Sequence, residues 1–148
     1  MQNNINQVHG NAETDRTSSI RELKPSFLAT YSLDEDFRTV FMRERQARGL
    51  SDSACYGKAA VDRKLYWSIF HKSGYKPKKR TAIALILTLQ PTVELMADLL
   101  RRLGYCLTHS DLFDVVIETC VERGIFEVER INEILYKAGL PVLGSRAE

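Results

Sequence analysis

The chain has 148 residues, of which 44% are hydrophobic and 27% are charged, and its formal net charge is only +2. This length suits one domain with a single core, and this composition is that of an ordinary globular protein rather than a disordered one. No run approaches the ~18 apolar residues that span a bilayer, and the start lacks the apolar region of a secretory signal, so we expect a cytoplasmic protein without membrane contact.

Residues 1–32 are rich in Asn, Thr, Ser and charge and show no apolar period, which is typical of a flexible polar tail. From residue 33 onward the apolar residues recur with a helical period, and residues 33–148 are predicted to form a single helical domain. In its first helix Phe37, Val40 and Phe41 share one stripe. Asp34 is the expected cap of this helix, and Gly49 is a natural stop.

Two short helices are predicted next. Ser51 is a good cap for the segment SDSACYGKA, and a tight step through Ala60 leads into DRKLYWSIFHK. In this second helix Leu65, Tyr66 and Ile69 share the inward face. Beyond Pro77, the segment TAIALILTL is apolar nearly all round, as expected of a short helix in the core.

Three more amphipathic helices are predicted in TVELMADLLRRLGY, DLFDVVIETCVERG and EVERINEILYKAGLP, with Thr92 capping the first and Ser110 the second. No stretch alternates with a period of two for long enough to argue a sheet, and a lone strand would have no partner. The predicted fold is therefore all-α, a compact bundle of about seven short helices.

Charge is divided unevenly along the chain. Between Lys58 and Arg80 eight cations stand against Asp62 alone, a local charge of +7, whereas the segment from Val93 to Leu135 carries nine acids and four arginines, giving −5. Such a field can orient an anionic partner toward one side of the protein. A run of Lys and Arg is also compatible with a merely solvated face.

The start of the helix after Pro77 breaks a local rule. Lys78, Lys79 and Arg80 lie where a capping oxygen is expected, and each cation near the positive end of the helix dipole is unfavourable by ~0.3–1 kcal/mol. A bound phosphate would reverse the sign of these contributions. This pattern predicts an anion site formed by the three cations.

Residues 33–103 resemble the lambda-repressor/Cro type of helix-turn-helix domain, with SDSACYGKA and DRKLYWSIFH as its second and third helices. Residues 104–148 would then be a C-terminal helical extension. The chain departs from the family at Tyr56, where a small residue is usual, and at Ala60, where Gly is usual. Both departures predict that the two helices cross further apart than in a standard repressor.

The segments GLSDSACYGKAAVDRKLYWSIF, YKPKKRTAIAL, LLRRLGY and INEILYKAGLPVLG together also resemble a small bacterial domain. This domain occurs alone or fused to the C-terminus of macro (ADP-ribose-binding) and other effector domains. The resemblance covers roughly residues 35–144 and implies a DNA-binding regulator.

We therefore expect a nucleic-acid-binding regulatory protein, with DNA rather than RNA as the target. In the helix-turn-helix resemblance, the outward side of the third helix faces DNA. Trp67 has three open roles: stacking on an unpaired base, contacting a partner protein, or covering the edge of the core. The residues expected at the interface are Arg63, Lys64, Trp67, Ser68, His71, Lys72, Lys76, Lys78, Lys79 and Arg80.

The alternative is a protein-interaction adaptor, or a regulatory subunit of a bacterial effector or defence-type system. The helices from Asp111 to Leu140 are expected to present acids outward, and they could form a homodimer seam or contact a separately encoded effector protein. The three cysteines match neither a disulfide framework nor a zinc pattern. Because the chain shows no phosphate loop and no local catalytic signature, we expect no metal, no cofactor and no enzymatic activity.

Overall fold

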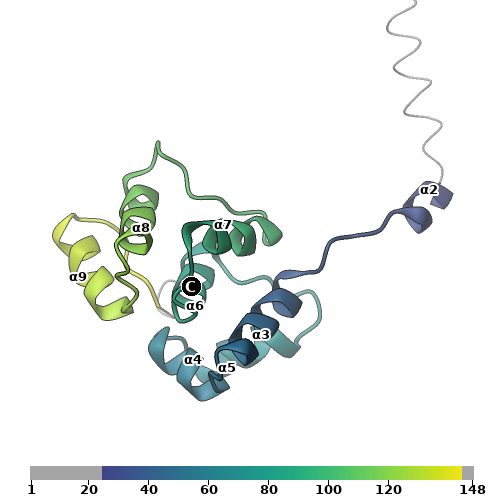
Figure 1. Cartoon of the computed structure of the whole chain (residues 1–148), viewed down its shortest axis with the longest axis horizontal. Coiled ribbons are helices and arrows are strands. Elements are labelled where there is room, and N and C mark those ends of the chain that lie inside the picture. Colours follow the sequence, from purple (N-terminus) through teal and green to yellow (C-terminus); the bar gives the residue numbers. More distant parts are fainter. Residues whose placement is uncertain (1–24, 145–148) are drawn as a thin grey trace, which may run out of the picture. The chain divides into compact units, whose positions relative to one another are not determined.

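The structure, a computed structural model, describes residues 25–144 apart from two side chains in its first helix. Within that range it contains eight helices and no strand, so the predicted all-α class is confirmed. The chain divides into two units, Met1–Asp34 and Glu35–Glu148. Helices α3 to α9 all belong to the second unit (Figure 1), which matches the expected bundle of about seven short helices.

Helix α2, Pro25–Thr30, lies within residues 1–32, the segment that we expected to be a flexible polar tail. The sequence pattern did not predict this short helix. Leu28, Tyr31 and Leu33 are exposed apolar residues of the same region. The remaining part of the expected tail, residues 1–24, lies outside the described residues.

Helix α3, Phe37–Ala47, begins two residues later than its expected cap would place it. Asp36, not Asp34, is the N-cap, because its Oδ1 accepts hydrogen bonds from the Thr39 backbone N at 2.9 Å and from the Thr39 hydroxyl at 2.7 Å. These bonds favour the ionised carboxylate and hold the pKa of Asp36 below its ordinary value.

Helix α6, Lys79–Leu87, is the centre of the core. Every residue from Thr81 to Leu87 is buried, as predicted for a helix that is apolar on all sides. It packs against α7, Val93–Arg102, and against α4, Asp52–Lys58. Because α6 is buried on all sides, its neighbours α4 and α7 can be short, since each needs only one apolar stripe to contact it.

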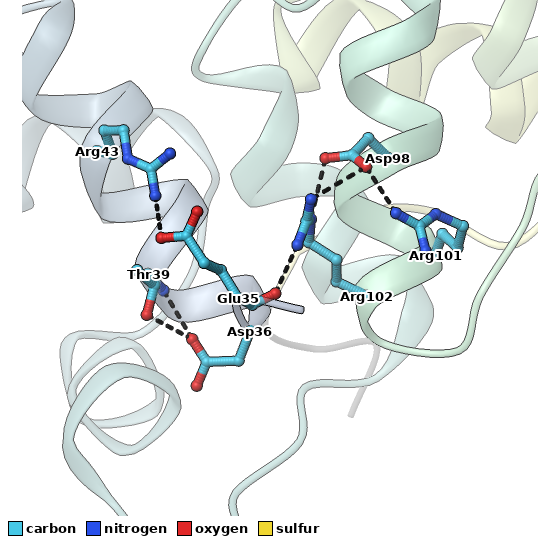
Figure 2. A network of polar contacts seen from close by, with 7 residues as sticks. All are labelled: Glu35, Asp36, Thr39, Arg43, Asp98, Arg101 and Arg102. Atoms are coloured by element: carbon cyan, nitrogen blue, oxygen red, sulfur yellow. Dashed lines mark hydrogen bonds and ion pairs between the residues drawn. The ribbon is translucent and has the colours of Figure 1, made fainter. Parts of the chain in front are cut away.

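The start of α3 is joined to the end of α7 by a network of polar contacts (Figure 2). Arg102 donates to the Asp98 carboxylate at 3.0 Å and also to the backbone carbonyl of Glu35, and Arg101 donates to Asp98 at 3.0 Å. The side chain of Glu35 in turn pairs with Arg43. The two arginines lower the pKa of Asp98, so this link is strongest when the carboxylate is ionised.

Helices α8, Leu112–Glu122, and α9, Val128–Lys137, pack against each other (Figure 1). The cap of α8 is Asp111 rather than the expected Ser110, since Asp111 Oδ1 accepts from the Phe113 N–H at 2.9 Å. The segment after α9 is tied back to it by two bonds between the Asn132 side chain and the backbone of Leu143. Among residues 25–144, each helix is too short or too polar to cross a bilayer.

Candidate nucleic-acid interface

Helices α4 and α5, Arg63–His71, are joined by a tight turn through Ala60. The N–H of Ala60 donates to the Gly57 carbonyl at 3.2 Å and that of Val61 to the Tyr56 carbonyl at 3.0 Å. These two bonds make a Schellman motif, which places its second-last residue, the one after the C-cap, in the left-handed region. Ala60 accordingly has φ +53°, the backbone conformation for which Gly is usual.

The space between α4 and α5 is filled by aromatic rings. Tyr56 is half-buried and its ring meets that of Tyr66 edge to face, with centroids 5.5 Å apart. The buried Tyr66 donates a hydrogen bond from its hydroxyl to Asp52 at 2.7 Å. Burial raises the pKa of Tyr66, and the bond to Asp52 raises it further. A bulky residue at position 56 is therefore accommodated by an aromatic contact between the helices.

The outward face of α5 carries the side chains that sequence reasoning placed there. Arg63, Lys64, Trp67 and His71 are exposed, and Ser68 is half-buried. Trp67 is 59% exposed, and its ring centroid lies 5.3 Å from that of His71 at an interplanar angle of 34°. This helix therefore brings two cations and an exposed ring pair together within nine residues.

The segment after α5 is held by residues that sequence reasoning missed. Arg38 on α3 donates to the backbone carbonyls of Lys72 and Tyr75, the second at 3.1 Å. Lys76 lies over the ring of Tyr105, with its Nζ 4.6 Å from the centroid. Because Arg38 is distant in sequence from its acceptors, no local pattern could have identified this contact.

At the start of α6, one of the three cations expected to form an anion site is already paired within the chain. Lys78 is the N-cap residue and makes no side-chain capping bond, as predicted. However, Lys79 Nζ lies 2.8 and 2.9 Å from the two carboxylate oxygens of Asp114, which is only 1% exposed. Lys79 is thus neutralised by the chain itself, and we remove it from the candidate interface.

Asp114 is an exception to the expectation that the acids of the C-terminal helices point outward. It is buried, and besides Lys79 it accepts hydrogen bonds from the backbone N and the hydroxyl of Thr108, at 2.9 and 3.2 Å. A signal was present, because Asp114 lies three and seven residues before the buried Ile117 and Val121 and so shares their helical face.

The other cations of the predicted site differ in how far they are exposed to solvent. Lys72, Lys76 and Lys78 are exposed and Arg80 is half-buried. Lys78 and Arg80 each make an interaction of their own, and Arg80 belongs to the helix whose later residues are entirely buried. The residues that the structure groups most clearly are those on α5, so the candidate interface is centred there.

Residues 25–144 contain no group of three or more His, Cys, Asp or Glu residues that could hold a metal ion. The three cysteines are free thiols, and burial raises the pKa of Cys55 and Cys120. His109, expected in a loop, pairs with Glu118 at 2.7 Å.

The described residues therefore define an all-helical protein with an exposed basic and aromatic helix face. Comparison with known proteins returned no significant match to a protein-family model, a curated protein or a solved structure.

Proposed function

We propose that this protein binds nucleic acid through α5, that the α4–α5 pair works as a helix-turn-helix of the repressor type, and that the protein is a regulator acting on DNA. The observation that carries the proposal is the exposed face of α5, where Lys64, Trp67 and His71 follow one another at helical spacing beside Arg63. Arginine can read guanine with two hydrogen bonds, and lysine and serine can hold phosphates.

The turn supports this role for α5. Ala60 adopts the left-handed conformation that the resemblance assigns to Gly, so the absence of Gly does not prevent a tight turn between the helices. The bulk of Tyr56 is absorbed by its contact with Tyr66. In proteins of this type the N-terminal part of the second helix enters the major groove, and here that part carries Arg63 and Lys64.

The charge distribution supports the choice of an anionic partner. With Lys79 neutralised by Asp114, seven of the eight cations between Lys58 and Arg80 remain outside that ion pair. Each contact between such a cation and a phosphate releases a counterion from duplex DNA, which makes the affinity depend on salt with a slope of about −0.9 per contact.

A double substitution of Arg63 and Lys64 by Gln tests the proposal. Affinity for a labelled duplex, measured by fluorescence anisotropy at several salt concentrations, is expected to fall, and the salt slope is expected to flatten by about 1 to 2 because up to two phosphate contacts are lost. The matched control is Lys137→Gln, which removes an exposed cation from α9. Equal losses in both variants, or no loss in either, would contradict the assignment of α5.

A second candidate function is protein interaction. A groove of about 200 Å³ between α8 and α9 is lined mainly by apolar side chains, and Ile134 at its edge is 37% exposed. We propose a second copy of this chain as its occupant, because repressor-type domains commonly bind two-fold symmetric sites as dimers. Ile134→Glu is then expected to lower the mass measured by light scattering to that of a monomer, and a monomeric parent protein would reject the dimer. If the parent protein is monomeric, a separately encoded effector protein becomes the proposed occupant of the groove between α8 and α9.

A further inference from the structure

A groove of about 410 Å³ lies between the start of α4 and the exposed face of α5. Its wall contains the rings of Tyr56, Tyr66, Trp67 and His71. Two of these rings are accounted for by the packing of α4 on α5, since Tyr56 and Tyr66 contact each other. Trp67 is different, because more than half of its surface is exposed and it contributes little to the core.

The ring pair of Trp67 and His71 resembles a platform for stacking. Its two rings are 5.3 Å apart and tilted by 34°, so the imidazole supports the indole from the same helix while leaving it largely open to solvent. A flat aromatic ligand of the size of a nucleobase would bury this indole. Such stacking does not depend on the identity of the base, because every base has a π face.

Polar groups complete the groove. Arg63 lines it one helical turn before Trp67, at the position where a cation can pair with the phosphate that precedes or follows a stacked base. The hydroxyls of Ser51 and Ser53, 3.2 Å apart, and the carboxylate of Asp52 line the groove from the start of α4 and can form hydrogen bonds to the edge of a base.

A paired base in a duplex presents only its edges to a protein, because its faces are covered by its neighbours in the stack. An exposed indole therefore matches an unpaired base better than it matches the floor of the major groove. We propose that the α4–α5 groove binds single-stranded DNA, with one unpaired base stacked on Trp67 and its phosphate paired with Arg63. This inference rests on the part of the proposed function that assigns nucleic-acid binding to α5, and it makes a single strand, in place of a duplex, the form that the groove binds.

The test uses the full chain, in which Trp67 is the only tryptophan, so that fluorescence excited selectively in the indole reports on this groove alone. The protein is titrated with an oligothymidylate of about 12 nucleotides and, separately, with a duplex of the same length. We expect the single strand to quench Trp67. Trp67→Ala is expected to weaken the binding of the labelled single strand by roughly 5- to 150-fold, the range that stacking of one base represents.

Two variants keep the result interpretable. Trp67→Phe retains a ring and is expected to recover most of the affinity lost in Trp67→Ala, whereas Tyr136→Ala, which removes an exposed ring from α9, is expected to change nothing. Circular dichroism verifies that each variant is folded. If Trp67→Ala does not fold, Arg63→Gln replaces it and is expected to weaken single-strand binding.

The outcomes separate the inference from the proposed function. Binding of the duplex without quenching and without binding of the single strand would overturn the inference and leave the proposed function standing. Binding of the single strand with unchanged fluorescence and no effect of Trp67→Ala would also overturn it. If neither nucleic acid binds at low salt, both the inference and the proposed function fail.

Discussion

The ion pair between Lys79 and Asp114 allows a sharp test of whether this lysine belongs to the core or to the interface. In Lys79→Met the aliphatic stem is retained and the charge is removed, so that the buried carboxylate of Asp114 keeps only its two bonds from Thr108. Removing one partner of a buried pair commonly costs about 3–5 kcal/mol. Because the Lys79 side chain is itself 29% exposed, we expect a value near the lower end, about 3 kcal/mol.

Urea unfolding followed by circular dichroism measures this cost. For a domain of this size the slope is about 1–3 kcal/mol per molar urea, so a loss of about 3 kcal/mol moves the midpoint down by roughly 1–3 M. The double variant Lys79→Met with Asp114→Leu removes both charges. It is expected to recover much of the lost stability, because a buried ion pair is often worth no more than apolar side chains of similar volume.

The same variant distinguishes structure from function. If Lys79 is a core residue, Lys79→Met lowers the urea midpoint and leaves the affinity for nucleic acid unchanged under conditions in which the protein is folded. If instead the midpoint moves by less than about 0.5 M and the affinity falls, Lys79 belongs to the interface and the reasoning from its contact with Asp114 is refuted.

Two further predictions concern stability. Ala60→Gly is expected to raise the free energy of unfolding by about 0.5–1 kcal/mol, because Gly relieves the left-handed strain at φ +53° at some cost in unfolded-state entropy; a lower urea midpoint would contradict this. The pKa values of Asp36 and Asp98 are lowered in the folded state, so the unfolded chain binds protons more readily. The stability that these two carboxylates contribute is therefore expected to be fully present above their ordinary pKa of 3.8 and to be lost as the pH falls below it. Asp36→Asn is expected to flatten the dependence of the unfolding free energy on pH between about 5 and 2.5, and an unchanged slope would exclude the cap at Thr39 as its source.

Several features of the fold could be predicted because they depend on neighbours in sequence. The apolar period identified α3 to α9, the uniform apolar character of Thr81–Leu87 identified the core helix, and Ser51 and Thr92 are caps as expected. The two wrong caps show the limit of this reasoning. Asp34 and Ser110 are chemically suitable, but the helices begin after Asp36 and Asp111, whose side chains accept the capping bonds instead.

In the candidate interface, too, some features could be predicted from neighbours in sequence and others could not. The outward face of α5 was predicted from helical spacing alone, and Arg63, Lys64, Trp67 and His71 are exposed there. The start of α6 was not predictable in this way. Its uncapped N-terminus and its excess of cations were recognised as a broken local rule, but the sequence did not show that one of the three cations, Lys79, is neutralised by Asp114.

For α3 to α9, the amino-acid sequence by itself determined which segments are helices and which side of each is apolar, because these properties follow from residues three or four positions apart. Only the tertiary structure decided what neutralises Lys79, since Asp114 lies 35 residues further along the chain. It also decided that Arg38 holds the segment after α5 and that rings from α4 and α5 line one groove. Contacts of this kind depend on how helices pack, and packing brings together residues that no local period connects.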